Sequence, residues 1–292
     1  MTPIQLTFSQ KPANGGAMFK ALALPRAGFS AKVGLPNIQA SWTGATVDTA
    51  ALQEYLTVLG LKTDTVLPVL YPHVMAGSMH MNMLSHKAFP IRLLGAVHLK
   101  NRIVQHSAIS IEETMDFHSE IGAYRLVEKG VEFDFSTRVV VAGQTAWEEV
   151  STYFMAGKFG GRENPSSETS FDLSKLESAN DQGQWHVPAN RGKQYAKITG
   201  DYNPIHMSSL AAKLFGFKRD IAHGFGVLAQ GIQRSSAWAG VDTDKSLQVD
   251  VIFKGPVFLD SQVSLKEGDN GRFDIYCGSN PKPSICAQVS EA

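Results

Sequence analysis

The chain has little of what marks several large classes of protein. Only two of its 292 residues are cysteines, Cys277 and Cys286. They flank a short loop and could face each other across strands, but without a secretory signal we expect free thiols. Lys plus Arg and Asp plus Glu both number 27, so the formal net charge is zero. Nucleic-acid binders carry a basic excess, so we expect no nucleic-acid partner.

Other signatures are missing as well. No apolar run is long enough to span a bilayer, and the first residues lack the charged region and apolar core of a signal peptide. We therefore expect a soluble cytoplasmic protein with no membrane contact. No His-Glu-x-x-His, Cys-x-x-Cys or Gly-x-Gly-x-x-Gly spacing occurs. The sequence thus predicts neither a metal nor a dinucleotide, and no cofactor.

The length and the 43% of apolar residues suffice for two ordinary domains or one large one. A stretch rich in Gly, Ser, Glu and Asp with few large apolar residues separates two patterned halves. We interpret this stretch as a linker or surface crossover. The predicted division is an N-terminal half at 1–157, the linker at 158–183 and a C-terminal half at 184–292.

Each half shows helical periodicity followed by strands of period two. Short turns between the strands predict antiparallel pairing. Helices are expected at 48–59, 70–84, 190–199, 208–215 and 222–238, with a fixed loop at 200–206. Strands are expected at 4–8, 19–24, 96–104, 108–111, 123–127, 131–141 and 146–154, and then at 247–253, 257–259, 262–265, 273–276 and 285–289.

The two halves can be aligned with each other. Residues 99–111 match 253–265 without a gap, and Tyr71-Pro-His-Val-Met75 falls opposite Ile221-Ala-His-Gly-Phe225. A single helix-plus-sheet unit would expose one edge of its sheet. Two such units joined edge to edge would form one continuous sheet wrapped around two helices.

One stretch combines an acid and a base, Tyr195-Ala-Lys-Ile-Thr-Gly-Asp-Tyr-Asn-Pro-Ile-His206. Gly200 and Pro204 interrupt any helix through it, so Asp201 and His206 are expected to converge on one point. An imidazole titrates near neutral pH and is the natural base. The first half has no counterpart of this stretch, which predicts one active site per chain.

This motif, followed by Ile221-Ala-His-Gly-Phe225, resembles the MaoC-like family of (R)-specific enoyl-CoA hydratases and 3-hydroxyacyl-thioester dehydratases. The resemblance covers roughly residues 185–240 directly. It implies an α+β double hot-dog fold, an antiparallel sheet wrapped around two long central helices. It also implies catalytic roles for Asp201, His206 and the Gly224 N–H. The residues expected to bind or orient the substrate are Asn203, His223, Tyr195 and Phe225.

The resemblance further implies a hydro-lyase that interconverts (R)-3-hydroxyacyl and trans-2-enoyl thioesters in fatty-acid metabolism. The thioester would be one of CoA or of acyl carrier protein, and a homodimer is left open. Two alternatives remain, namely a hot-dog acyl-CoA thioesterase and a non-catalytic acyl-thioester binding protein.

Three groups of residues are weighed between a structural and a functional interpretation. Met75, Met79 and Met83 would be core filler or the wall of an acyl tunnel. Lys213, Lys218 and Arg219 would form a solvated helix face or meet the phosphates of CoA or a phosphopantetheine arm. The remaining histidines are expected to be structural: His73, His80, His86, His98, His106, His118 and His186.

Overall fold

The computed structural model describes residues 2–13, 28–63, 65–91, 96–160, 171–174, 176, 180–239 and 246–292. The strand expected at 19–24 and much of the predicted linker lie outside these ranges. No helix within them is long and apolar enough to cross a membrane.

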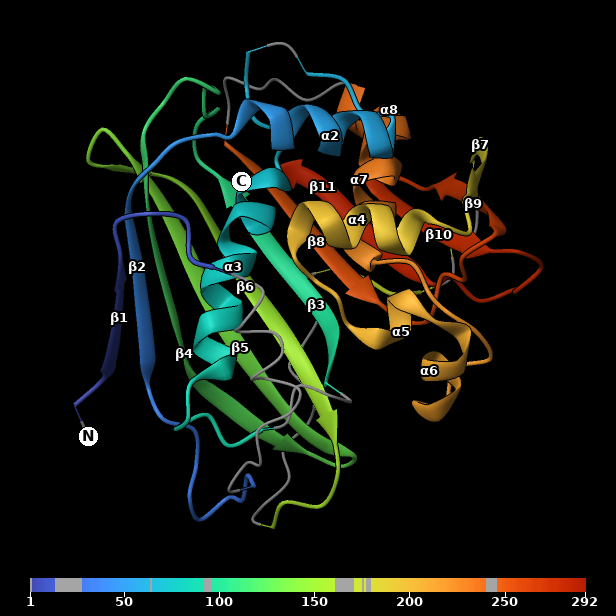
Figure 1. The fold of residues 1–292 in the computed structure, drawn as a ribbon. Coiled ribbons are helices and arrows are strands. Elements are labelled where there is room, and N and C mark those ends of the chain that lie inside the picture. The colour runs from blue at the N-terminus through green and yellow to red at the C-terminus, as the bar shows by residue number, and fades with distance from the viewer. Residues whose placement is uncertain are drawn as a thin grey trace.

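The described strands form one continuous sheet (Figure 1), in the order β1-β2-β4-β5-β6-β3-β8-β11-β10-β9-β7. All neighbouring pairs are antiparallel except β1 with β2. The strands of the first half are β1 Ile4–Phe8, β2 Ile38–Ala45, β3 Ala96–Gln105, β4 Met115–Val127, β5 Gly130–Val141 and β6 Gln144–Ala156. Those of the second half are β7 Asn180–Val187, β8 Leu247–Phe253, β9 Ser261–Glu267, β10 Arg272–Cys277 and β11 Ile285–Glu291.

The two halves meet where β3 pairs with β8. The register runs from Lys100 opposite Ile252 to Gln105 opposite Leu247, and Arg102 donates to the Gln248 side chain across the seam at 2.7 Å. This pairing confirms the predicted edge-to-edge junction. Because each strand covers the other's open edge, neither half presents that edge to solvent.

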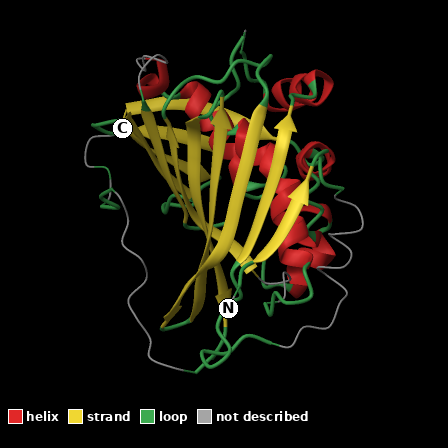
Figure 2. Ribbon diagram, turned by 90° about the vertical axis from the view of Figure 1, so that its left-hand side faces the viewer, coloured by secondary structure: helices red, strands yellow, loops and turns green. Residues whose placement is uncertain are grey.

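The helices lie against one face of the curved sheet (Figure 2). Their bounds are α2 Thr49–Leu59, α3 Tyr71–Ser85, α4 Arg191–Thr199, α5 Pro204–Met207, α6 Ser209–Leu214, α7 Gly224–Arg234 and α8 Ser236–Ala239. Asp48 caps α2 by accepting from the Ala51 N–H at 3.0 Å, and Gly60 ends it in the left-handed conformation. The α3 helix is buried nearly all round, as its continuous apolar sequence predicts.

Several sequence predictions are wrong in extent. The helix expected at 222–238 is broken at Ser235, whose extended backbone separates α7 from the short α8. Residues 108–111 and 257–259 form no strands and contribute only isolated bridges, at Ser110 and Phe258. The loop expected at 200–206 includes a helical turn, because Pro204 begins α5.

The β7 strand was not predicted. It begins at Asn180, inside the stretch interpreted as a linker, so strand pairing starts before the predicted boundary at residue 184. Its sequence, Asn-Asp-Gln-Gly-Gln-Trp-His-Val, is polar and lacks alternation because β7 is an edge strand paired only with β9. Cys277 and Cys286 are both buried and free, as expected.

Candidate active site

Local hydrogen bonds shape the segment that carries the predicted acid and base. The α4 helix ends at Gly200 with a φ of 78°, a left-handed conformation that glycine adopts readily. Asp201 Oδ1 accepts from the Asn203 N–H at 3.1 Å, and the Asn203 side chain caps α5 by accepting from the Ile205 N–H at 3.4 Å. These turns bring Asp201 and His206 to the same point.

His206 is held in one tautomer. Its Nδ1 donates to the Ile221 carbonyl oxygen at 2.8 Å, so Nε2 of the neutral ring is an acceptor. That Nε2 lies 4.0 Å from Asp201 Oδ2. The gap is too long for a direct hydrogen bond and suits one bridging water.

His223 lies directly on His206. The ring centroids are 3.7 Å apart with an interplanar angle of 28°. The His223 Nε2 donates to the main-chain oxygen of Asp201 at 3.0 Å. Its Nδ1 is buried with no partner among the described residues. The centroid of the Tyr195 ring lies 4.8 Å from that of the His223 ring.

The electrostatics favour a carboxylate beside two neutral imidazoles. Burial lowers the pKa of both His206 and His223, because the protonated rings would be poorly solvated. Burial alone would raise the pKa of Asp201, but His223, His206 and the Asn203 N–H together hold this pKa below its ordinary value. The resting site therefore has a base at His206 and an anion at Asp201.

The N-terminus of α7 faces the cavity that Asp201 and His206 line. Gly224 is the first residue of α7, and no described residue accepts a hydrogen bond from its N–H. A Cβ at this position would lie 2.7 Å from the Phe253 ring, so only glycine fits without a shift. The free N–H and the partial positive charge of the helix end suit an oxygen on which negative charge develops.

A cavity of about 460 Å³ joins these groups. All seven predicted site residues line it: Asp201, His206, Gly224, Asn203, His223, Tyr195 and Phe225. From the first half, α3 contributes Val74, Gly77, Met81 and Leu84 to the wall. The site is thus built from both halves of the chain.

The three groups of residues that had both a structural and a functional interpretation differ in whether they line the cavity. Met75, Met79 and Met83 are buried in the core and do not line the cavity, so the core-filler interpretation holds. Lys213, Lys218 and Arg219 do not line it either, whereas Lys254 does. His73, His80 and His98 were expected to be purely structural, but all three line the cavity. The one sequence signal was the internal alignment, which set His73 opposite His223.

Asp201, His206 and His223 also have possible metal-ligand atoms within 4.8 Å of one another. His223 Nε2 is engaged with the Asp201 carbonyl oxygen, whereas its Nδ1 has no partner among the described residues. The absence of a metal, expected from the sequence, stays a prediction.

The chain is similar to known proteins in sequence and in structure. The model of the MaoC like domain family matches residues 179–276. The curated protein 3-hydroxyacyl-thioester dehydratase X of Mycobacterium tuberculosis is 27% identical over 241 residues, which cover 81% of this chain and 83% of that protein.

Solved structures are similar over most of the chain. The crystal structure of HtdX from Mycobacterium tuberculosis has a TM-score of 0.71 at 24% identity and covers 87% of this chain and 100% of that one. A MaoC-like dehydratase from Phytophthora capsici has a TM-score of 0.64 at 17% identity, over 87% of this chain and 95% of that one. With the joined sheet described above, these likenesses show that the chain has the double hot-dog fold and that its second half is similar to the MaoC like domain family.

Proposed function

We propose that the protein is a hydro-lyase that interconverts (R)-3-hydroxyacyl thioesters and trans-2-enoyl thioesters of CoA or acyl carrier protein. The observation that carries this proposal is the unprotonated Nε2 of His206, 4.0 Å from Asp201 Oδ2 and in the same cavity as the free Gly224 N–H. Hydration needs a base for water, a proton for the α-carbon and a donor for the thioester oxygen, and these groups supply all three.

The thioester oxygen is placed at the Gly224 N–H. As negative charge builds on that oxygen, the donor and the N-terminus of α7 stabilise it more in the transition state than in the ground state. Phe253 and Phe225 flank this position and exclude bulk water from it. The α,β-double bond then lies against Asp201 and His206.

The water is held between His206 Nε2 and Asp201 Oδ2. His206 takes a proton as the water oxygen bonds to the β-carbon, and the electrons of the double bond move onto the thioester. The proton on His206 then returns through the new hydroxyl, which lies between the two side chains, to the Asp201 carboxylate and on to the α-carbon, which neutralises the enolate and restores the neutral imidazole. Dehydration is the same path reversed.

The two alternatives make different demands on the site. A hot-dog thioesterase would use a carboxylate to drive hydrolysis, whereas here the carboxylate of Asp201 is paired with the unprotonated Nε2 of His206. A binding protein needs no unprotonated imidazole beside a carboxylate. The proposed place of action is the cytoplasm.

Incubation of the protein with trans-2-enoyl-CoA tests the proposal. We expect the enoyl-thioester absorbance to fall with no release of free thiol, and chiral analysis to give the (R)-alcohol. Thiol release would establish a thioesterase, and no change in either signal would indicate a binding protein. An (S)-product, or activity abolished by EDTA and restored by zinc, would overturn the mechanism.

A further inference from the structure

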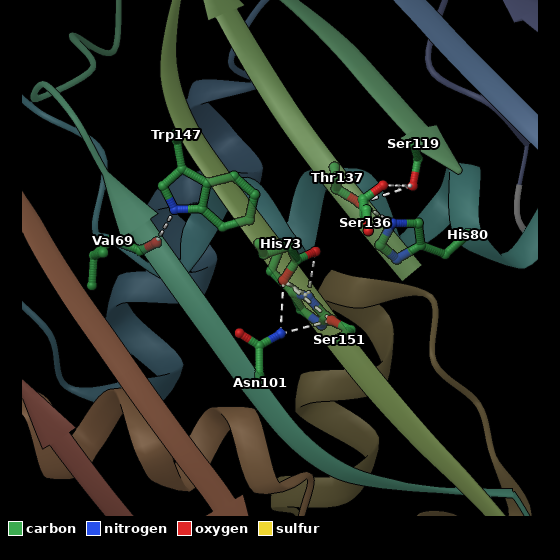
Figure 3. A network of polar contacts seen from close by, with 10 residues as sticks. Val69, His73, His80, Asn101, Ser119, Ser136, Thr137, Trp147 and Ser151 are labelled. Carbon is green, nitrogen blue, oxygen red and sulfur yellow. Dashed lines mark hydrogen bonds and ion pairs between the residues drawn. The ribbon is translucent and has the colours of Figure 1, made fainter. Parts of the chain in front are cut away.

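A second polar cluster lies on the first-half wall of the cavity. Figure 3 shows His73, Asn101 and Ser151 converging from α3, β3 and β6. They meet at the fully buried carboxylate of Glu149. Its oxygens accept from His73 Nδ1 at 2.8 Å, from Asn101 Nδ2 at 2.8 Å and from Ser151 Oγ at 3.3 Å.

The charge of Glu149 fixes the orientation of His73. Burial alone would raise the pKa of Glu149, but His73, His80 and Asn101 outweigh it and lower this pKa to about 2. An ionised carboxylate only accepts hydrogen bonds, so His73 Nδ1 carries the proton. The His73 Nε2 then points away from Glu149 and has no partner among the described residues. The side chain is 15% exposed and lines the cavity.

His73 lies near the predicted reaction centre. Its ring stacks on Phe225, with centroids 3.9 Å apart, and Phe225 directly follows Gly224. The cavity face of α3 continues from His73 through Gly77 and Met81 to Leu84. At 1.5 Å per residue this face is about 16 Å long. His73 therefore comes first along it, and the apolar Met81 and Leu84 come last.

The exposed Nε2 of His73 distinguishes a role in binding a ligand from a purely structural role. Packing of α3 against β6 requires only the bond between His73 Nδ1 and Glu149. An unbranched hydrocarbon chain in the cavity would instead bury Nε2 without a hydrogen bond, which is unfavourable. A hydroxyl satisfies this nitrogen in either state, because it donates to the neutral ring and accepts from the protonated one.

We propose that His73, oriented by Glu149, hydrogen-bonds a hydroxyl group on the acyl chain, beyond the carbons that react. The preferred substrates are then acyl thioesters that carry a chain hydroxyl in addition to the group formed by hydration. The proposal rests on the proposed function in one respect, that the thioester end of the ligand lies at Gly224.

Binding of unreactive ligands tests this subsite separately from catalysis. Saturated acyl-CoA esters with one hydroxyl at successive chain positions beyond the β-carbon are compared by calorimetry with the unsubstituted ester of the same length. Saturated chains cannot be hydrated, so only affinity is measured. We expect one hydroxyl position to bind about tenfold tighter, which corresponds to about 1.4 kcal/mol. Equal or weaker binding at every position would overturn the proposal.

Paired variants assign the effect to the cluster. The double variant H73F/E149L removes both partners and so leaves no unpaired buried charge. It should lose the preference for the hydroxylated ester. H73Q, whose amide can still donate to Glu149, should also lose the preference for the hydroxylated ester. This variant replaces the double variant if the double variant does not fold. The matched control is H106F, because His106 forms a surface pair with Glu148 at 3.3 Å.

The control should keep the tenfold ratio. A ratio that persists in a folded H73F/E149L or H73Q variant would overturn the proposal. Absorbance of enoyl-CoA is followed in the same preparations. Absent hydration together with an intact hydroxyl preference would refute the proposed function and leave the subsite standing.

Discussion

His206 and His223 stack face to face 3.7 Å apart, yet their hydrogen bonds give their Nε2 atoms opposite roles. His206 Nδ1–H donates a hydrogen bond to the main-chain oxygen of Ile221, and His223 Nε2–H donates one to the main-chain oxygen of Asp201. Only His206 therefore offers an acceptor toward the Asp201 carboxylate. Two adjacent cations would repel each other, so His206 adds to the burial that lowers the pKa of His223 and keeps that ring neutral.

The shared water makes Asp201 and His206 one functional unit. We expect D201N and H206A each to lower kcat by at least about 10²-fold, the low end for loss of a positioned acid or base. The double variant should be little worse than the poorer single variant, because groups that act together are strongly non-additive. Steady-state kinetics with enoyl-CoA measures all three.

Circular dichroism and thermal melting must first show that these variants fold. If the two losses simply multiply, the residues act in separate steps and the shared-water mechanism is wrong. If D201N keeps full activity, the motif is only a turn and the reaction takes place elsewhere.

Gly192 supports His206 from outside the cavity. A Cβ at this second position of α4 would lie 2.1 Å from the main-chain oxygen of His206. Helix propensity alone would favour alanine over glycine by about 1 kcal/mol. The clash should dominate, so we expect G192A to lower kcat at least about tenfold, since a displacement of 1 Å can cost far more.

The control for G192A is G122A, whose nearest contact would be an ordinary 3.6 Å to Asn37. It should keep activity near that of the wild type. Activity and melting temperature are measured for both variants. A fully active G192A would show that α4 does not position His206.

The sequence predicted the part of the site that is local along the chain. Asp201, Asn203 and His206 belong to one continuous motif whose glycine and proline determine its turns, and all three line the cavity. The cluster at His73 escaped prediction because it depends on distant contacts. Glu149 lies 76 residues from His73 along the chain. The cavity that His73 lines forms only when the two halves of the chain are joined.

In the fold, too, features set by local sequence were predicted and features set by distant contacts were missed. Strands with alternating apolar residues were predicted well, such as β8, whose bounds of 247–253 match. The polar β7 was missed because an edge strand needs little apolar surface. The break at Ser235 was missed because the apolar periodicity continues past it into α8, and the backbone there follows tertiary packing.

Acid should destabilise the protein through its buried neutral histidines. Burial lowers the pKa of His98 to about 3, whereas an exposed histidine titrates near 6.5. Between these values the unfolded chain binds more protons than the folded one, so the free energy of unfolding falls as the pH falls. Above pH 6.5 or so the effect vanishes, because both states are neutral there.

The variant H98F should remove part of this dependence. The His98 Nε2 is buried without a partner, and the ring stacks on Tyr153, so phenylalanine fits its surroundings. H98F loses the hydrogen bond of His98 to the Lys100 main chain but also removes the unpaired Nε2, so we expect it to be about as stable as the wild type at neutral pH. At pH 4.5 it should exceed the wild type by about 2 kcal/mol. Urea unfolding at several pH values measures this, with H106F as a surface control. Parallel pH profiles for H98F and the wild type would contradict the assignment.

The seam between β3 and β8 predicts that the C-terminal half cannot act alone. Residues 180–292 contain the whole Asp201 motif, but in isolation they expose the edge of β8 and lack the cavity wall from α3. We expect this fragment to be insoluble or inactive, since an open strand edge promotes aggregation. Co-expression with residues 1–160 should restore both solubility and hydration, because the two pieces can pair again through β3. Solubility and enoyl-CoA turnover are compared with the intact chain. A soluble, fully active fragment would show that the first half is dispensable, and failure of co-expression would show that the seam forms only within one continuous chain.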